Sequence, residues 1–141
     1  MINRRIRVMC IDDNKLVAEA VELRLQSEPN VEWVGWLSDS DDLLRGIELA
    51  KPDVLLLDVD MPGRDAFTLL RELKTRTPGV RTVMFSGYVR ADYIDRAISA
   101  GAWGYVSKNE AFDELLGAIR QVSAGEFALS GDVTLQHLHA R

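Results

Sequence analysis

Five short apolar runs alternate along the chain with five stretches of helical spacing. The runs, which are rich in β-branched residues, are Ile6–Ile11, Val31–Leu37, Val54–Leu57, Thr82–Phe85 and Trp103–Val106. After each run, apolar residues recur at intervals of three and four, which is typical of an amphipathic helix. Strands that alternate with helices of this length predict a parallel sheet covered by helices on both faces. The third run has no polar alternation, which predicts a central strand buried on both sides.

The composition is that of an ordinary globular domain with a small acidic excess. The chain has 141 residues, of which 47% are apolar, and its formal charge is −5. This length suits one domain, and the acidic balance argues against a domain that itself binds nucleic acid. Cys10 is the only cysteine and lies in an apolar run, so we expect a buried thiol and no disulfide. No apolar stretch approaches the ~20 residues of a membrane span, and we expect a cytoplasmic protein that binds no membrane.

The alternating pattern ends before the C-terminus of the chain. We expect residues 1–125 to form the domain, and residues 126–141 to be a tail or the beginning of a linker. Within the tail, the spacing of Val133, Leu135 and Leu138 suits either a short helix or a frayed end.

Polar side chains follow four of the five predicted strands. They are Asp12 and Asp13 after the first strand, Asp58 and Asp60 after the third, Ser86 after the fourth, and Lys108 after the fifth. In an open parallel sheet, ligands bind outside the carboxyl ends of the strands. We therefore expect these carboxylates, the hydroxyl and the lysine to converge on one rim of the sheet.

This set of side chains suits phosphoryl transfer. Clustered carboxylates repel one another unless a cation holds them ionised, and Mg²⁺ prefers carboxylate oxygens, water and phosphate. A lysine and a hydroxyl nearby can bind phosphoryl oxygens, so the set predicts an aspartyl phosphate. Taken singly, Asp12-Asp13 suits a helix N-cap and Lys108 a surface lysine. Their joint placement at four strand ends favours the site.

Four segments carry a resemblance to a known family. They are Cys10-Ile11-Asp12-Asp13, Asp58-Val59-Asp60-Met61-Pro62-Gly63, Ser86-Gly87 and Gly101-Ala102-Trp103-Gly104-Tyr105-Val106-Ser107-Lys108. On these segments the chain resembles, over residues 5–125, the receiver domain of a bacterial two-component response regulator. The resemblance implies a flavodoxin-like, doubly wound α/β fold with five parallel strands in the order 2-1-3-4-5.

The resemblance also implies a phospho-acceptor and a magnesium site. In this family the aspartate of the Asp-x-x-Met-Pro segment accepts the phosphoryl group, which implies Asp58 here. The acidic pair implies Asp13 as a direct Mg²⁺ ligand and Asp12 as a ligand through water. Asp58 itself is a further ligand, and Asp60 would bind the metal through its backbone carbonyl.

Three further residues match positions that respond to phosphorylation in the family. Ser86 matches the Ser or Thr that closes on the phosphoryl group, and Lys108 matches the lysine that pairs with it. Tyr105 matches the aromatic residue that turns inward on activation. The implied partner is a sensor histidine kinase or a phosphotransfer protein. The resemblance implies a signalling switch and not an enzyme in the ordinary sense. Self-catalysed phosphorylation and dephosphorylation are nevertheless expected.

Finer detail resembles the receivers that precede a helix-turn-helix DNA-binding domain. The similarity runs through the Gly101–Lys108 segment to Gly125-Glu126-Phe127. It implies a role in transcription regulation, either for a free-standing receiver or for a receiver cut from a longer regulator. A homodimer through the face of the fourth helix, fifth strand and fifth helix is also expected.

Three positions depart from the family pattern, and the side-chain orientation of two tryptophans needs a separate prediction. Asn109 replaces the proline that many members have after the lysine, so a cis peptide bond is not expected there. Asp60 and Tyr88 place a carboxylate and an aromatic ring at the mouth of the site, where we predict that they tune the lifetime of the phosphorylated state. Trp33 and Trp36 are three residues apart, which predicts that they face opposite sides of their strand.

Two other functions compete with this interpretation. Leu56-Leu57-Asp58-Val59-Asp60 also suits a small magnesium-dependent phosphatase of the haloacid-dehalogenase type, but Asp12 and Asp13 precede the motif instead of following the lysine. An unphosphorylated receiver-like interaction module is the second alternative, and it would usually lack part of the acidic set, which is complete here.

Overall fold

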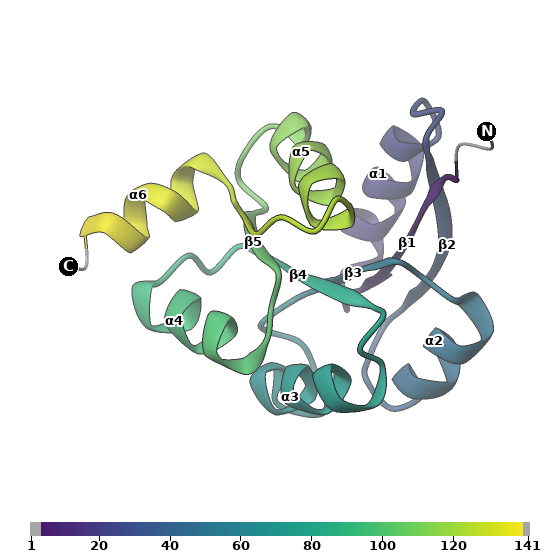
Figure 1. Cartoon of the computed structure of the whole chain (residues 1–141), viewed down its shortest axis with the longest axis horizontal. Helices are drawn as coiled ribbons and strands as arrows, with labels where there is room; N and C mark the ends of the chain where they lie inside the picture. Colours follow the sequence, from purple (N-terminus) through teal and green to yellow (C-terminus); the bar gives the residue numbers. More distant parts are fainter. Residues whose placement is uncertain (1–3, 140–141) are drawn as a thin grey trace.

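The computed structural model describes residues 4–139, which form six strands and six helices (Figure 1). In chain order they are β1 (Ile6–Ile11), α1 (Lys15–Leu25), β2 (Val31–Leu37), α2 (Leu43–Ala50), β3 (Val54–Leu57), α3 (Ala66–Arg76), β4 (Arg81–Ser86), α4 (Ala91–Ala100), β5 (Gly104–Ser107), α5 (Phe112–Ser123), β6 (Ala128–Leu129) and α6 (Gly131–His139). All five predicted strands are present, and their ends differ from the predicted ends by at most one residue.

The strands form one parallel sheet in the order β2-β1-β3-β4-β5-β6. The predicted flavodoxin-like order 2-1-3-4-5 is confirmed, and the predicted count of five strands is too low by one. The additional strand, β6, pairs with the outer edge of β5. It has two residues, which is too short for an apolar period to reveal it in the sequence.

Helices cover both faces of the sheet, as predicted. Helices α1 and α5 pack against one face, where the core includes Val8, Val21 and Ile119. Helices α2, α3, α4 and α6 contribute to the core on the other face. The four residues of β3 are fully buried, which confirms the central strand. Cys10 is also buried, and burial raises the pKa of its thiol to about 12, as suits a core residue.

One predicted orientation is wrong. Trp33 and Trp36 both pack against the core cluster shared with α1 and α5, instead of facing opposite sides. The reason is a bulge in β2: Val8 pairs with Trp33, and the next residue of β1, Met9, pairs with Gly35. One extra residue between the two tryptophans shifts the alternation, so both rings lie on the same side.

Local signals at helix ends fix the segments that carry the polar residues. The side chain of Asn14 accepts hydrogen bonds from the backbone amides of Leu16 and Val17, at 3.1 and 3.3 Å. Asn14 is therefore the N-cap of α1, and it directly follows Asp12 and Asp13. At the end of α4, Gly101 has φ 106°, a left-handed conformation that glycine adopts without strain. This turn leads the chain into β5 and towards Lys108.

Three further features bear on the sequence predictions. The peptide bonds of residues 4–139, including the bond between Lys108 and Asn109, are all trans. Within the same residues, no helix is long and apolar enough to cross a membrane. The end of the chain, predicted as a helix or a frayed end, is helical from Gly131 onward.

Candidate functional site

The polar residues expected at the strand ends lie on one rim of the sheet. The backbone hydrogen bonds of the sheet continue one residue beyond the strands: Asp58 N donates to Ile11 O at 3.2 Å, and Lys108 N donates to Ser86 O at 2.9 Å. Because these bonds fix the backbone, Asp58 and Lys108 are held beside the ends of β1 and β4. Asp12 and Asp58 are buried, whereas Asp13 is exposed.

Lys108 links the two buried carboxylates. Its Nζ lies 2.6 Å from Asp12 Oδ2 and 3.1 Å from Asp58 Oδ2. Burial raises the pKa of Asp58, and the neighbouring Lys108 ammonium opposes that effect. Burial alone would lower the pKa of Lys108, but its contacts with Asp12 and Asp58 outweigh this, and its pKa is raised. The lysine is therefore held in its charged form beside the carboxylates.

The acidic cluster has the donor set of a magnesium site. Carboxylate oxygens of Asp12, Asp13 and Asp58 all lie within 4.8 Å of one another. Asp12 Oδ2 is buried and makes no hydrogen bond of normal geometry, so its one close partner is the ammonium of Lys108. A buried oxygen with unused capacity beside two further carboxylates fits a hard cation. These residues therefore fit Mg²⁺.

Asp60 contributes its backbone to the same cluster. Its amide donates to Asp58 Oδ1 at 3.3 Å, which orients the carboxyl group of Asp58. The side chain of Asp60 is exposed. Its expected role as a metal ligand through the backbone carbonyl stays a prediction.

Ser86, Tyr88 and Tyr105 form a second polar group next to the acidic cluster. Ser86 is fully buried, and its Oγ accepts from the backbone amide of Tyr88 at 3.0 Å. The hydroxyl of Tyr105 donates to the backbone carbonyl of Tyr88. Tyr105 is only 1% exposed, and burial raises its pKa, an effect that the Ser86 side chain opposes. The ring of Tyr105 thus lies inward, in contact with the loop that follows Ser86.

Asp60 and Tyr88, which were predicted at the mouth of the site, share one cavity next to it. Both line a cavity of about 320 Å³ whose wall also includes Phe67, Tyr93 and Arg96. The Arg96 guanidinium lies 4.1 Å from the centre of the Phe67 ring. Their predicted effect on the lifetime of the phosphorylated state stays a prediction.

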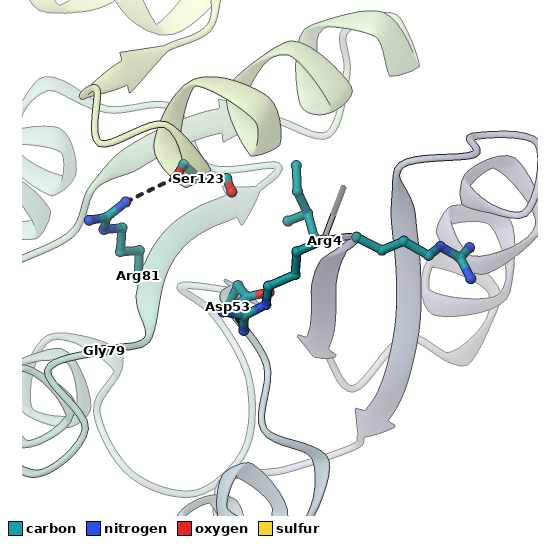
Figure 2. Close-up of a pocket in the computed structure, with 7 residues that line it drawn as sticks. Arg4, Asp53, Gly79, Arg81 and Ser123 are labelled. Carbon is teal, nitrogen blue, oxygen red and sulfur yellow. Dashed lines mark hydrogen bonds and ion pairs between the residues drawn. The ribbon is translucent and has the colours of Figure 1, made fainter. Parts of the chain in front are cut away.

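A second polar cavity, of about 350 Å³, lies at the opposite end of the sheet (Figure 2). Its charged side chains are paired within the protein. Arg4 forms an ion pair with Asp53, and Arg81 donates to the carbonyls of Val122 and Ser123 at the end of α5. This cavity is remote from Asp58 and takes no part in the site.

The sequence did not predict two hydrogen bonds that hold Asp12 and Tyr105 in place. Trp36 Nε1 donates to the backbone carbonyl of Asp12 at 2.7 Å, which fixes the acidic turn. This contact depends on the bulge in β2. The acceptor of the Tyr105 hydroxyl is a backbone carbonyl, which any residue at position 88 would supply, so no sequence signal marks it.

Comparison with known proteins gives the same assignment. The family model of the response regulator receiver domain matches residues 8–120. Response regulator GacA of Pseudomonas aeruginosa is 32% identical over 131 residues, which are 93% of this chain and 61% of that protein. The nitrate/nitrite response regulator protein NarL of Escherichia coli is 33% identical over 130 residues, which are 90% of this chain and 59% of that protein. The chain thus spans about three-fifths of the length of these relatives.

Solved structures share the fold. A two-component response regulator of the LuxR family from Aurantimonas sp. SI85-9A1 has a TM-score of 0.91 at 26% identity and covers 97% of this chain and 98% of its own. The isolated REC domain of RcsB from Salmonella enterica serovar Typhimurium, with the phosphomimetic BeF3−, has a TM-score of 0.87 at 22% identity, over 94% of this chain and 99% of its own. The chain belongs to the response regulator receiver domain family and is related to transcriptional regulators of the LuxR and NarL type.

Proposed function

We propose that Asp58 accepts a phosphoryl group from the phosphohistidine of a sensor histidine kinase or a phosphotransfer protein. The observation that supports this most directly is the contact of the Lys108 ammonium with both Asp58 and Asp12. It places a fixed positive charge beside a carboxyl group that lies at the rim where ligands of a parallel sheet bind.

The transfer is an in-line displacement at phosphorus. An ionised oxygen of Asp58 attacks, the new P–O bond forms as the P–N bond to the imidazole breaks, and the imidazole nitrogen keeps the electron pair of that bond. Lys108 favours the ionised, nucleophilic form of Asp58 and neutralises charge on the phosphoryl oxygens. Mg²⁺ held by Asp12, Asp13, Asp58 and the carbonyl of Asp60 would neutralise further phosphoryl charge. The same groups would catalyse self-phosphorylation from small donors and later dephosphorylation.

The phosphoryl group then changes the balance between two conformations. A ligand shifts a two-state protein only by its differential affinity for the two states. Here the covalent phosphoryl group favours the state in which the hydroxyl of Ser86 and the ammonium of Lys108 both reach it. Because Ser86 contacts the loop that binds the Tyr105 hydroxyl, the change extends to β5.

The output is control of a partner or of an effector domain, in keeping with relatives that are transcriptional regulators. A homodimer through α4, β5 and α5 stays a prediction, and α6, which packs on α4 and β5, would have to join such an interface or leave it. The cytoplasmic location expected from the sequence also stays a prediction.

Intact-mass measurement tests the proposal. The protein is incubated with Mg²⁺ and a small acyl phosphate, and Asp58→Ala is the control. One added phosphoryl group on the wild type alone, dependent on Mg²⁺, is expected. If no adduct forms and the donor is not consumed, the chain is an interaction module. Rapid consumption of the donor without an adduct, abolished by Asp60→Asn, would instead indicate a phosphatase.

A further inference from the structure

The segment Ala128–His139, called here the C-terminal segment, forms β6 and α6 and lies along the free edge of β5 (Figure 1). Ala128 N donates to Trp103 O at 3.0 Å, and Ser130 N donates to Tyr105 O at 3.1 Å. The approach is close at Gly104, where an added Cβ would lie only 2.8 Å from the carbonyl oxygen of Ala128. The absence of a side chain at position 104 is what allows β6 to pair with β5.

The beginning of α6 is tied to the loop that follows Lys108. Glu110 accepts from the amide of Asp132 at 3.1 Å and from the hydroxyl of Ser130. Glu114 accepts from the amide of Gly131 at 2.7 Å. Two carboxylates thus satisfy two of the free amides of the first turn of α6. Since Glu110 is two residues beyond Lys108, movement of that loop moves the C-terminal segment as well.

The C-terminal segment also closes the space beside Tyr105. Leu129 pairs with Tyr105 in the sheet and packs against the same core cluster, so both side chains lie on one face. Val133 of α6 is fully buried in that cluster. Further along the helix, His137 Nε2 lies 3.3 Å from Asp95 Oδ1 of α4. The outer edge of β5, the strand that carries Tyr105, is therefore covered by β6 and α6.

α6 also borders the two loops that surround the acceptor site. A cavity of about 380 Å³ lies between them, lined by Gly87 and Val89 after β4, Asn109 after β5, and Asp132 and Leu135 of α6. The same element thus borders the loop that carries the acceptor of the Tyr105 hydroxyl and the loop that carries Lys108.

We propose that the C-terminal segment holds Tyr105 in its inward position and thereby favours the conformation that phosphorylation of Asp58 stabilises. The proposal rests on the proposed function. By reciprocity, whatever detaches the segment weakens binding of a phosphoryl analogue, and the analogue in turn strengthens attachment of the segment. The segment is then a part of the switch and not a passive tail.

Two readouts in the full chain test this inference. The first is the dissociation constant of beryllofluoride with Mg²⁺. The second is exposure of the Tyr105 ring, measured without beryllofluoride by relaxation of its NMR signals with a soluble paramagnetic agent. Val133→Ala removes the buried contact of α6, and Gly104→Ala displaces β6 by a clash with its backbone. Leu138→Ala is the matched control, because Leu138 lies on the same helix, is 60% exposed and does not line the cavity beside the two loops.

Val133→Ala and Gly104→Ala are expected to weaken beryllofluoride binding by about fivefold or more. Both should increase exposure of the Tyr105 ring, whereas Leu138→Ala should match the wild type. Faster hydrogen exchange of the amides of residues 130–134 checks that each variant has loosened the segment. The inference would be overturned if the amides of the C-terminal segment exchange hydrogen faster in a variant while the exposure of the Tyr105 ring stays unchanged. Tighter binding of beryllofluoride by the variants would overturn it as well. If either variant fails to fold, the other decides. If the wild type binds no beryllofluoride, the proposed function fails, and the ring measurement still decides whether the segment holds Tyr105.

Discussion

The ammonium of Lys108 lies 3.1 Å from a carboxyl oxygen of Asp58, although the two residues are 50 positions apart in the sequence. The pairing exists because β3 and β5 end at the same rim with β4 between them. It is partly buried, with 17% of the lysine side chain and 7% of the aspartate side chain exposed. Under the proposed function, this charge lies beside the acceptor oxygen throughout the transfer.

Removal of that charge should slow phosphorylation strongly. Lys108→Ala takes away the ammonium that opposes the rise in the pKa of Asp58 and that, under the proposed function, neutralises the transferred phosphoryl group. We expect the rate of phosphorylation by an acyl phosphate to fall by about 10²-fold or more, as for other fixed charges aimed at a transition state. The rate is measured by intact mass over time, with Lys74→Ala on the exposed surface of α3 as control. A decrease of less than about tenfold would exclude this role for the lysine.

Magnesium should stabilise the folded protein through Asp13. The side chain of Asp13 is exposed, so Asp13→Asn removes a carboxylate of the proposed Mg²⁺ site without opening the core. We expect Mg²⁺ to raise the free energy of unfolding of the wild type by about 2.7 kcal/mol at a hundred times its dissociation constant. Asp13→Asn should lose most of this gain, and Asp42→Asn, an exposed residue without a side-chain cap bond, should retain it. Urea unfolding with and without Mg²⁺ measures the difference, and equal gains in all three proteins would contradict the site.

Asp60 and Tyr88 should control the lifetime of the aspartyl phosphate. Asp60 and the 51% exposed Tyr88 line one cavity next to Asp58. We expect the carboxylate of Asp60 to accept a proton from the attacking water, and the ring of Tyr88 to restrict the entry of water. Asp60→Asn is therefore expected to slow dephosphorylation and Tyr88→Ala to accelerate it, each by about threefold or more. The decay of the adduct is followed by intact mass, with exposed Asp92→Asn as control. Unchanged decay in both variants would show that neither side chain acts on the water.

Asp65 should stabilise the start of α3 in a pH-dependent manner. Its side chain accepts from Thr68 N at 2.9 Å, and this hydrogen bond lowers the pKa of Asp65 below its ordinary value of 3.8. Because the folded pKa is lowered, the stabilisation is present above pH 3.8 and is lost as the pH falls through the folded pKa. Asp65→Ala should cost about 1 kcal/mol of unfolding free energy at neutral pH.

The matched variant for that prediction is Asp65→Asn, which keeps a capping oxygen without a titratable group. Its unfolding free energy should stay within a few tenths of a kcal/mol of the wild type at pH 7. The gap between wild type and Asp65→Ala should close below pH 3.8. A gap of constant size from neutral pH to well below pH 3.8 would show that the carboxylate is not the capping group.

The rim of the sheet could be predicted from the sequence because each residue there follows a strand of clear apolar pattern. Asp58 comes after four consecutive buried residues, and Lys108 follows β5 in the same way. Parallel pairing then brings the two together without any knowledge of side-chain contacts. The order of the four motif segments along the chain was also sufficient to predict the family.

Other features have no such signal. The bulge that brings Trp33 and Trp36 to one side of β2 arises from the pairing of that strand with β1, which the sequence of β2 alone does not encode. The two residues of β6 are too few to show a period. The position of α6 depends on glutamates of an earlier segment, Glu110 and Glu114, whose partners are backbone amides. Backbone partners leave no trace in the residue type, so these contacts become visible only in the structure.

The central claim is that the phosphoryl group resides on Asp58, and residue-level mapping tests it most directly. Borohydride reduces an acyl phosphate to the corresponding alcohol, so phosphorylated protein is treated with borohydride, digested and sequenced by tandem mass spectrometry. The account predicts a homoserine residue at position 58 alone, dependent on Mg²⁺. A homoserine at position 12, 13 or 60, or none at position 58 in protein whose intact mass shows the adduct, would contradict it.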